Sequence, residues 1–224
     1  MEATTTTASE AHCRHCGAGS TTPHFCSECG KIQPVAVGVD YFEFFQLPRR
    51  LRLDESELEK SFYALSRRFH PDYFMSASPA EQQASTDRSS LLNEAYRTLR
   101  DPIRRTQYLL LLEGYKEAEK KAPPDLLEEV FELNMQIEEM KAARKLGDPH
   151  EVAEARASLE QAENGLRERL AAIDSNLFAA FEQWDSAADS EDEGRRKAVL
   201  NRFSELMSHR SYIQSLTREI GEEI

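Results

Sequence analysis

Four cysteines near the N-terminus are spaced as metal ligands, in the pattern Cys-x2-Cys-x9-Cys-x2-Cys. They are Cys13, Cys16, Cys26 and Cys29. Two thiolates three positions apart can both face one metal ion across a tight turn. The glycine after each pair, Gly17 and Gly30, lets the backbone curl back so that its N–H groups point at the sulfurs. Two such turns complete a tetrahedral four-sulfur site, which suits Zn²⁺ bound in a closed, structural role.

Other interpretations of the four cysteines are two disulfides, four unligated thiols, or iron in a rubredoxin-like site. Disulfides are disfavoured in a cytoplasmic protein because that compartment keeps thiols reduced. Four cysteines confined to seventeen residues are too closely grouped to be without a purpose. Histidines at positions 12, 15 and 24 are nearby, but four thiolates already suffice for the metal. Zinc is therefore the prediction, and iron is its main alternative.

The tripeptide His70-Pro71-Asp72 carries an imidazole, a rigid ring and a carboxylate between two helical patterns. Pro71 cannot continue a helix and disfavours the helical conformation of His70, so the preceding helix must end there. The apolar residues before it recur with helical spacing, as do those after it within residues 85–100. They are Leu58, Phe62, Leu65 and Phe69 upstream, and Leu92, Ala95, Tyr96 and Leu99 downstream. The sequence therefore predicts an exposed loop at the tip of a helical hairpin.

Three cations lie on the helix that leads to this loop, away from its apolar stripe: Lys60, Arg67 and Arg68. By themselves, three cations on one helix face indicate only a solvated surface. Their place beside the His70-Pro71-Asp72 loop makes them candidates for binding the same partner as the loop.

The remaining sequence is helical in pattern and predicts an all-α fold. A short aromatic helix begins after Asp40, and Asp101 is a plausible N-cap with Pro102 at the first helical position. Beyond residue 124, apolar heptads recur in three stretches, separated by Gly147-Asp148-Pro149 and by an acidic turn over residues 186–194. Sustained heptads joined by short polar loops predict an antiparallel three-helix bundle. We expect a four-cysteine segment and linker over residues 1–39, a helical hairpin domain over 40–114 and the bundle over 115–224.

The first bundle helix carries two apolar stripes. Its heptad seam consists of Leu126, Val130, Leu133, Ile137 and Met140. A second stripe, Leu127, Phe131 and Met135, lies on a neighbouring face of the same helix. Either the helix has a wide buried face, or the second stripe is exposed for a partner. Periodicity alone favours the wide buried face.

Composition excludes several classes of function. The chain has 224 residues, of which 40% are hydrophobic and 30% charged, as in a folded, mostly helical protein. Residues 115–224 hold 15 Lys and Arg against 25 Asp and Glu, which argues against nucleic acid as the main partner. No apolar run is long enough to span a membrane and the N-terminus lacks a signal-peptide pattern, so we expect a cytoplasmic protein. No phosphate loop, His-Glu-x-x-His motif or nucleophile–base pair predicts an enzyme.

Together these motifs resemble the HscB/Jac branch of J-proteins, the co-chaperones of iron–sulfur cluster biogenesis. The resemblance covers residue 40 to the C-terminus, and the cysteine segment is similar to the zinc-binding extension of some members. The matching motifs are Asp40-Tyr41-Phe42, Arg68-Phe69-His70-Pro71-Asp72, Leu92-Asn93-Glu94-Ala95-Tyr96, Thr98-Leu99-Arg100-Asp101-Pro102, Tyr108-Leu109-Leu110 and Leu126-Leu127-Glu128-Glu129.

The resemblance implies two partners. His70, Pro71 and Asp72, with Lys60, Arg67 and Arg68, would dock on an HscA/DnaK-type chaperone and stimulate its ATPase. The bundle would bind the scaffold protein IscU through Leu127, Phe131, Glu132 and Phe203. The resemblance therefore implies that the second stripe is exposed, whereas periodicity alone favours its burial. Tyr73 departs from the family, which usually has a lysine or arginine after the tripeptide. The alternative is a general J-domain co-chaperone whose bundle binds another client. The sequence makes no prediction about oligomeric state.

Overall fold

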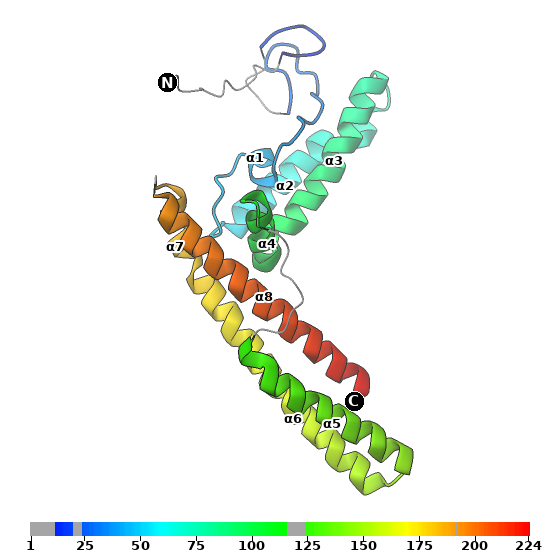
Figure 1. Cartoon of the computed structure of the whole chain (residues 1–224). Coiled ribbons are helices and arrows are strands. Elements are labelled where there is room, and N and C mark those ends of the chain that lie inside the picture. Colours follow the sequence, from blue (N-terminus) through cyan, green and yellow to red (C-terminus); the bar gives the residue numbers. More distant parts are fainter. Residues whose placement is uncertain (1–11, 20–23, 116–123, 191) are drawn as a thin grey trace. The chain divides into compact units, whose positions relative to one another are not determined.

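The computed structural model describes residues 12–19, 24–115, 124–190 and 192–224, and every regular element within them is a helix (Figure 1). One of our expectations, the missing signal pattern at the extreme N-terminus, falls outside these residues. The chain divides into two compact units. The first contains Met1–Arg49 and Leu53–Arg105, and the second contains Arg50–Arg52 and Thr106–Ile224.

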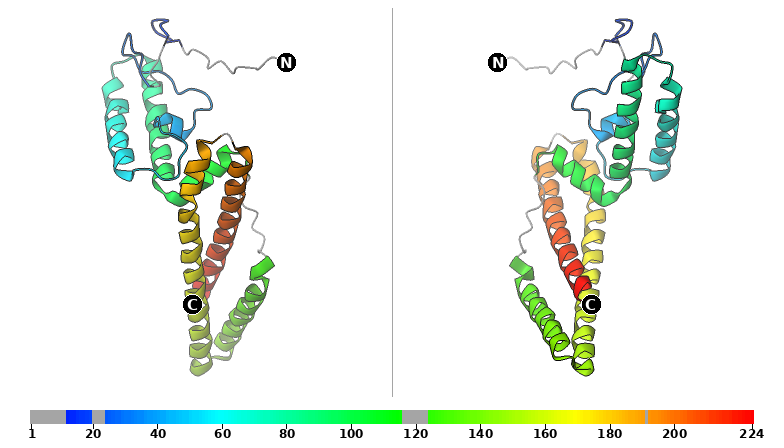
Figure 2. Two further views of the ribbon diagram at one scale, coloured as in Figure 1. Left: turned by 90° about the vertical axis from the view of Figure 1, so that its left-hand side faces the viewer. Right: turned by 90° about the vertical axis from the view of Figure 1, so that its right-hand side faces the viewer.

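The first unit is built on a hairpin of two antiparallel helices, α2 (Glu55–Phe69) and α3 (Pro79–Arg100), with the short helix α1 (Tyr41–Phe44) beside them (Figures 1 and 2). Helix α2 ends at Phe69, as the proline at position 71 predicts. Helix α3 begins six residues before the predicted start, because Ser78 and Glu81 form a capping box and Pro79 occupies the first turn.

The core of this hairpin lies where the predicted stripes of α2 and α3 face each other. Its buried members include Phe42, Phe44, Leu58, Phe69, Ala84, Leu92, Ala95 and Leu99. The 3-10 helix η1 (Pro71–Phe74) carries the chain away from α2. Helix α4 (Pro102–Leu112) then follows, and the Asp101 carboxylate accepts hydrogen bonds from the N–H groups of Ile103 and Arg104, which confirms the predicted N-cap.

The second unit contains the predicted antiparallel three-helix bundle, made by α5 (Leu127–Leu146), α6 (Pro149–Ala179) and α8 (Glu193–Glu223) (Figure 2). The 3-10 turn η2 (Pro124–Leu126) precedes α5. Gly147 ends α5 with a positive φ of 76°, which glycine adopts without strain, and Asp148 caps α6. The shared core consists of Leu126, Leu133, Ile137, Met140, Leu159, Leu166, Ile213, Leu216 and Ile220.

The second heptad stretch is interrupted in a way that its pattern does not show. The prediction continues this stretch, with one heptad position skipped, as far as the acidic turn at residue 186. The structure instead ends α6 at Ala179 and begins α7 (Phe181–Ala188) after a tight turn at Ala180. The turn buries Phe181 and Trp184. None of the described helices is both long and apolar enough to cross a membrane.

Candidate metal centre and interaction surfaces

The four cysteine sulfurs converge on one point, with all four Sγ atoms within 4.8 Å of one another. Cys13 and Cys29 are separated by 3.6 Å and Cys16 and Cys26 by 3.7 Å, measured between sulfurs. A tetrahedral ion with metal–sulfur bonds of about 2.3 Å needs sulfurs about 3.8 Å apart, so the separations fit such an ion. They are far too long for disulfides, and all four cysteines are free.

Two knuckle turns build the site, as the glycine positions predict. Gly17 and Gly30 have φ values of 75° and 67°, and their N–H groups donate back to the carbonyls of Cys13 and Cys26. The backbone N–H groups of Cys16 and His15 donate to Cys13 Sγ and lower the pKa of Cys13 to about 6. These donors stabilise a thiolate, which is the form that binds metal.

The pKa of Cys29 indicates that the four sulfurs need a cation between them. The backbone N–H of Lys31 lowers the pKa of Cys29, but desolvation and the hydrogen bonds with the other three cysteines outweigh it and raise the pKa to about 12. Four sulfurs this close together cannot all be ionised unless a positive charge lies between them. The donor set therefore fits a thiophilic metal ion, and its four protein ligands leave no position for a substrate.

The cysteine segment, meaning the described residues 12–19 and 24–34, is packed against α3 of the same unit. Arg88 of α3 is buried, and its guanidinium donates to the carbonyls of Gln33 (2.6 Å) and Pro34 (3.0 Å). It also lies 2.6 Å from Nδ1 of His24. Because a guanidinium has only donors, Nδ1 of His24 must accept. An ion pair of 2.9 Å between Lys31 and Glu81 adds a second tie.

The ionisation states of this contact follow from burial. Burial and the neighbouring charge of Arg88 lower the pKa of His24 to about 4, so its ring is neutral at physiological pH. Burial also lowers the pKa of Arg88, to about 10, which leaves the guanidinium charged. His24 thus serves as an acceptor for Arg88 and is not among the grouped metal ligands.

The His70-Pro71-Asp72 loop is exposed at the end of α2, as predicted. The side chains of His70 and Asp72 are 53% and 75% exposed. Within the loop, the backbone N–H of Asp72 donates to Nδ1 of His70 and the N–H of Tyr73 donates to the His70 carbonyl. The tripeptide therefore has a defined shape, and its imidazole and carboxylate remain available to a partner.

All three candidate cations of α2 are exposed. Lys60 forms an ion pair with Glu57 at 2.7 Å, and Nε of Arg67 donates a hydrogen bond to the Tyr63 carbonyl. Arg68 places its guanidinium 4.2 Å from the centre of the Phe25 ring, so it also holds the cysteine segment.

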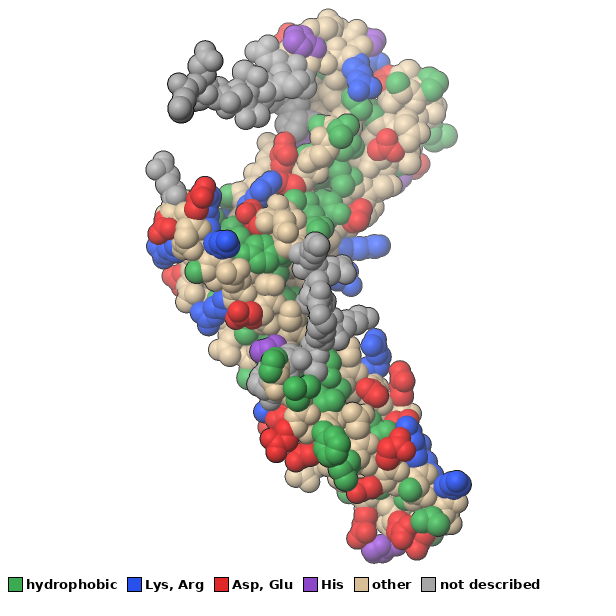
Figure 3. Space-filling view, viewed as in Figure 1, with side chains coloured by type: hydrophobic (Ala, Val, Ile, Leu, Met, Phe, Trp, Pro, Cys, Tyr) green, Lys and Arg blue, Asp and Glu red, His purple; other side chains and the backbone are tan. Residues whose placement is uncertain are grey.

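The second apolar stripe of α5 is exposed, so the wide buried face favoured by periodicity is wrong. Leu127, Phe131 and Met135 are 56%, 67% and 51% exposed. The heptad residues Leu133, Ile137 and Met140 are buried as predicted. In the space-filling view, hydrophobic side chains bordered by acidic ones lie over this helix (Figure 3). Glu132, which follows Phe131 on the same helix, is also exposed.

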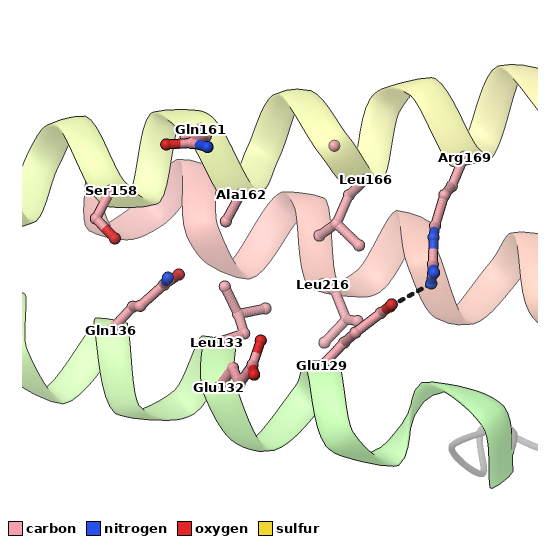
Figure 4. A pocket seen from close by; sticks show the side chains of 11 residues that line it. Glu129, Glu132, Leu133, Gln136, Ser158, Gln161, Ala162, Leu166, Arg169 and Leu216 are labelled. Carbon is pink, nitrogen blue, oxygen red and sulfur yellow. Dashed lines mark hydrogen bonds and ion pairs between the residues drawn. The ribbon is translucent and has the colours of Figure 1, made fainter.

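A groove of about 370 Å³ runs along the inner side of α5, between it and α6 (Figure 4). Leu133, Leu166 and Leu216 line its apolar part, and Glu129 forms an ion pair with Arg169 at its rim. Glu132 also lines this groove, so it lies next to both the groove and the exposed stripe.

The structure corrects the expectation for Phe203. Its side chain is fully buried on α8, where the sequence resemblance implies contact with a partner. The heptad of α8 turns this residue inward, so it supports the bundle and presents no surface.

Arg88, which holds the cysteine segment against α3, is the residue of this site that sequence reasoning missed. A signal for it exists, because position 88 falls in the same helical stripe as Ala84, Leu92, Ala95 and Leu99, where a charged residue is unexpected. Nothing in the sequence indicates that the cysteine segment supplies the acceptors.

The loop, the hairpin and a family match define the class of this protein. Residues 40–108 match the DnaJ domain, and the exposed His-Pro-Asp tripeptide lies within that match. The chain is a J-domain protein.

Individual relatives identify the family within this class. The chain is 34% identical over 180 residues to the iron–sulfur cluster co-chaperone protein HscB of Mus musculus, covering 77% of this chain and 71% of that protein. It is 40% identical over 107 residues to a co-chaperone protein HscB homolog of Vibrio cholerae, covering 46% and 63%. The chain belongs to the HscB family of co-chaperones.

Solved structures agree with this assignment. The crystal structure of human co-chaperone protein HscB matches with a TM-score of 0.68 and 25% identity, over 95% of this chain and 98% of that one. The chaperone HscB from Vibrio cholerae matches with a TM-score of 0.55 and 27% identity, over 82% and 96%.

Proposed function

We propose that this chain stimulates the ATPase of an HscA/DnaK-type chaperone and delivers an IscU-type iron–sulfur scaffold protein to it. The observation that carries the proposal is the exposed loop at the end of α2, whose imidazole and carboxylate face solvent. The Asp72 carboxylate pairs with a cation on the chaperone, His70 adds polar contacts and Pro71 fixes the loop. The exposed Lys60 and Arg67, with Arg68 beside them, bind acidic groups of the same partner.

The exposed stripe of α5 is the surface proposed for the scaffold protein. Leu127 and Phe131 are large apolar side chains exposed on one face of α5, and such anchors commonly dominate interfaces. Glu132 borders them and selects a partner with a cation at the matching position. The mouse relative is an iron–sulfur cluster co-chaperone, which supports a scaffold protein as the client.

Zn²⁺ is the metal proposed for the four-cysteine site, in a structural role. The sulfur separations fit a tetrahedral ion, and four protein ligands leave no open position for chemistry. Relatives of the chain are named co-chaperones, which supports a function without an enzymatic reaction of its own. A cytoplasmic location stays a prediction, consistent with four thiols kept reduced for metal binding.

One experiment tests both partner proposals. ATP hydrolysis by an HscA-type chaperone is measured alone, with this chain, with an IscU-type scaffold, and with both. We expect stimulation by the chain and a larger effect when the scaffold is also present. If the chain stimulates the ATPase but the scaffold neither increases that stimulation nor binds in a direct titration, the chain is a J-domain co-chaperone of another client. No stimulation by the chain would contradict the proposal itself.

A further inference from the structure

The backbone just before the exposed loop is anchored to α3. Phe69 is the last residue of α2, and His70 follows it directly. The Phe69 carbonyl accepts hydrogen bonds from the hydroxyls of Ser85 (2.6 Å) and Ser89 (3.0 Å). These two bonds replace the helical partner that the end of α2 lacks. They fix the backbone from which the loop begins.

The ring of Phe69 is held by the cysteine segment. The ring is fully buried, with His24 edge-on at 5.1 Å and Phe25 stacked at 5.8 Å between centroids. Arg68 in turn lies over the ring of Phe25. Two consecutive residues of the cysteine segment therefore cover the side chain whose backbone starts the loop.

The cysteine segment has few buried side chains of its own. Among the described residues of the cysteine segment, the buried side chains are Cys13, His24, Cys26 and Ile32. Two of these four are metal ligands, and His24 is held by Arg88. A segment with so little apolar core folds when its metal binds and loosens when the metal leaves. Without the metal, His24 and Phe25 lose the turns that place them on Phe69.

A second path connects α3 to the metal ligands. Arg88 donates to the backbone carbonyl of Gln33, and the side-chain amide of Gln33 donates to Cys13 Sγ at 3.5 Å and to the Lys31 carbonyl at 2.8 Å. Gln33 thus contacts a ligand sulfur and the turn that follows the second cysteine pair. Groups that hydrogen-bond to metal ligands hold them in place and tune metal affinity. Arg88 acts on the metal through Gln33.

We propose that the metal centre and the His70-Pro71-Asp72 loop are energetically linked, with Arg88 as the positioning residue that holds the cysteine segment against Phe69. The occupied centre orders the loop that docks on the chaperone. Because linkage is reciprocal, the packing of the segment on α3 also retains the metal. This inference rests on the proposed zinc binding and the proposed role of the loop.

Hydrogen exchange measures the first half of the linkage. The full chain is compared with zinc bound and after zinc is removed by a chelator under reducing conditions. The Asp72 and Tyr73 amides, which donate within the loop, report its order. We expect their exchange to become about 10-fold faster without zinc, within the usual range for linked sites. The amides of α8, which belong to the other unit, are the internal control and keep their rates.

Zinc release measures the second half. Arg88→Met keeps the aliphatic stem but removes every donor, so three acceptors lose their partner. We expect zinc transfer to a coloured chelator to be about 10- to 100-fold faster, as when groups behind metal ligands are removed. Arg88→Lys, which keeps one cationic donor group, restores part of the retention. Leu99→Ala is the matched control, because Leu99 is fully buried in the same unit but lies eleven residues further along α3. It destabilises the unit and leaves zinc release at the wild-type rate.

The outcomes separate this inference from the proposed function. Equal loop exchange with and without zinc overturns the inference, even if the chaperone's ATPase is stimulated. Wild-type zinc release from Arg88→Met, or release equally fast from Leu99→Ala, overturns the role of Arg88. Linked exchange and zinc release in a chain that stimulates no chaperone support the linkage and contradict the proposed function. If Arg88→Met fails to fold, hydrogen exchange of the wild-type protein with and without zinc tests the linkage, and zinc release from Arg88→Lys tests the role of Arg88.

Discussion

The ring of Phe203 on α8 lies edge-on to the ring of Phe181 on α7, with centroids 6.1 Å apart, and Phe203 is fully buried. This pair closes the core at the end of the second unit where α7 meets α8. Phe203→Ala should lower the free energy of unfolding by about 3–5 kcal/mol, as expected for removal of a buried aromatic ring. Chemical denaturation measures the change. The variant, while folded, should bind the scaffold protein with wild-type affinity. A stable variant that has lost scaffold binding would contradict the buried, supporting role.

The exposed stripe of α5 should behave in the opposite way. Leu127→Ala/Phe131→Ala removes two exposed side chains, so we expect little loss of stability and loss of most scaffold affinity. Calorimetric titration and thermal unfolding of the same preparation separate the two effects. Leu133→Ala is the matched control, since Leu133 is buried on the same helix, and it should cost about 2–5 kcal/mol of stability. A double variant that unfolds much earlier but binds normally would refute the proposed surface.

The loop variants Asp72→Asn and His70→Gln should abolish ATPase stimulation without unfolding the protein. Both side chains are exposed and neither supports the core. Each change removes a charge or alters a hydrogen-bonding group while its size stays similar. Circular dichroism should show unchanged helix content, and a chaperone ATPase assay should show no stimulation. Full stimulation by both variants would contradict the role of the loop.

Loss of one cysteine should empty the metal site. We expect one Zn²⁺ per purified chain and its loss in Cys16→Ser or Cys26→Ser, because a missing thiolate opens the tetrahedral shell. Metal analysis after gel filtration gives the stoichiometry. The helices of the bundle should persist, because their shared core contains no residue of the cysteine segment. A coloured protein containing iron, or a metal-free protein with four reactive thiols, would contradict zinc.

Lys60→Ala/Arg67→Ala should weaken the chaperone contact less than the loop variants do. Both cations are exposed, so their charge acts through solvent and is screened by salt. We expect a higher concentration of the chain for half-maximal ATPase stimulation, with maximal stimulation preserved. The deficit should shrink as ionic strength rises, which titrations at low and high salt measure. A deficit independent of salt would argue against an electrostatic role.

The sequence by itself determined the features that depend on local backbone chemistry. Pro71 stops α2 at Phe69 whatever lies around it, so the exposed loop could be placed from the residues alone. The spacing of the cysteines and their glycines likewise determined which four sulfurs converge. The heptad of α5 correctly named Leu133, Ile137 and Met140 as buried, because helical period decides which side chains share a face.

Only the tertiary structure decided which surfaces are covered. Periodicity gives α5 two apolar stripes, but its neighbours cover one of them, and Phe131 is left exposed while Phe203 is enclosed. The turn at Ala180 and the burial of Arg88 were also decided by tertiary packing and not by the helical period. Burial depends on what residues distant in the sequence bring to a position. Arg88 can be buried because Gln33, Pro34 and His24, more than fifty residues earlier, supply acceptors for its donors.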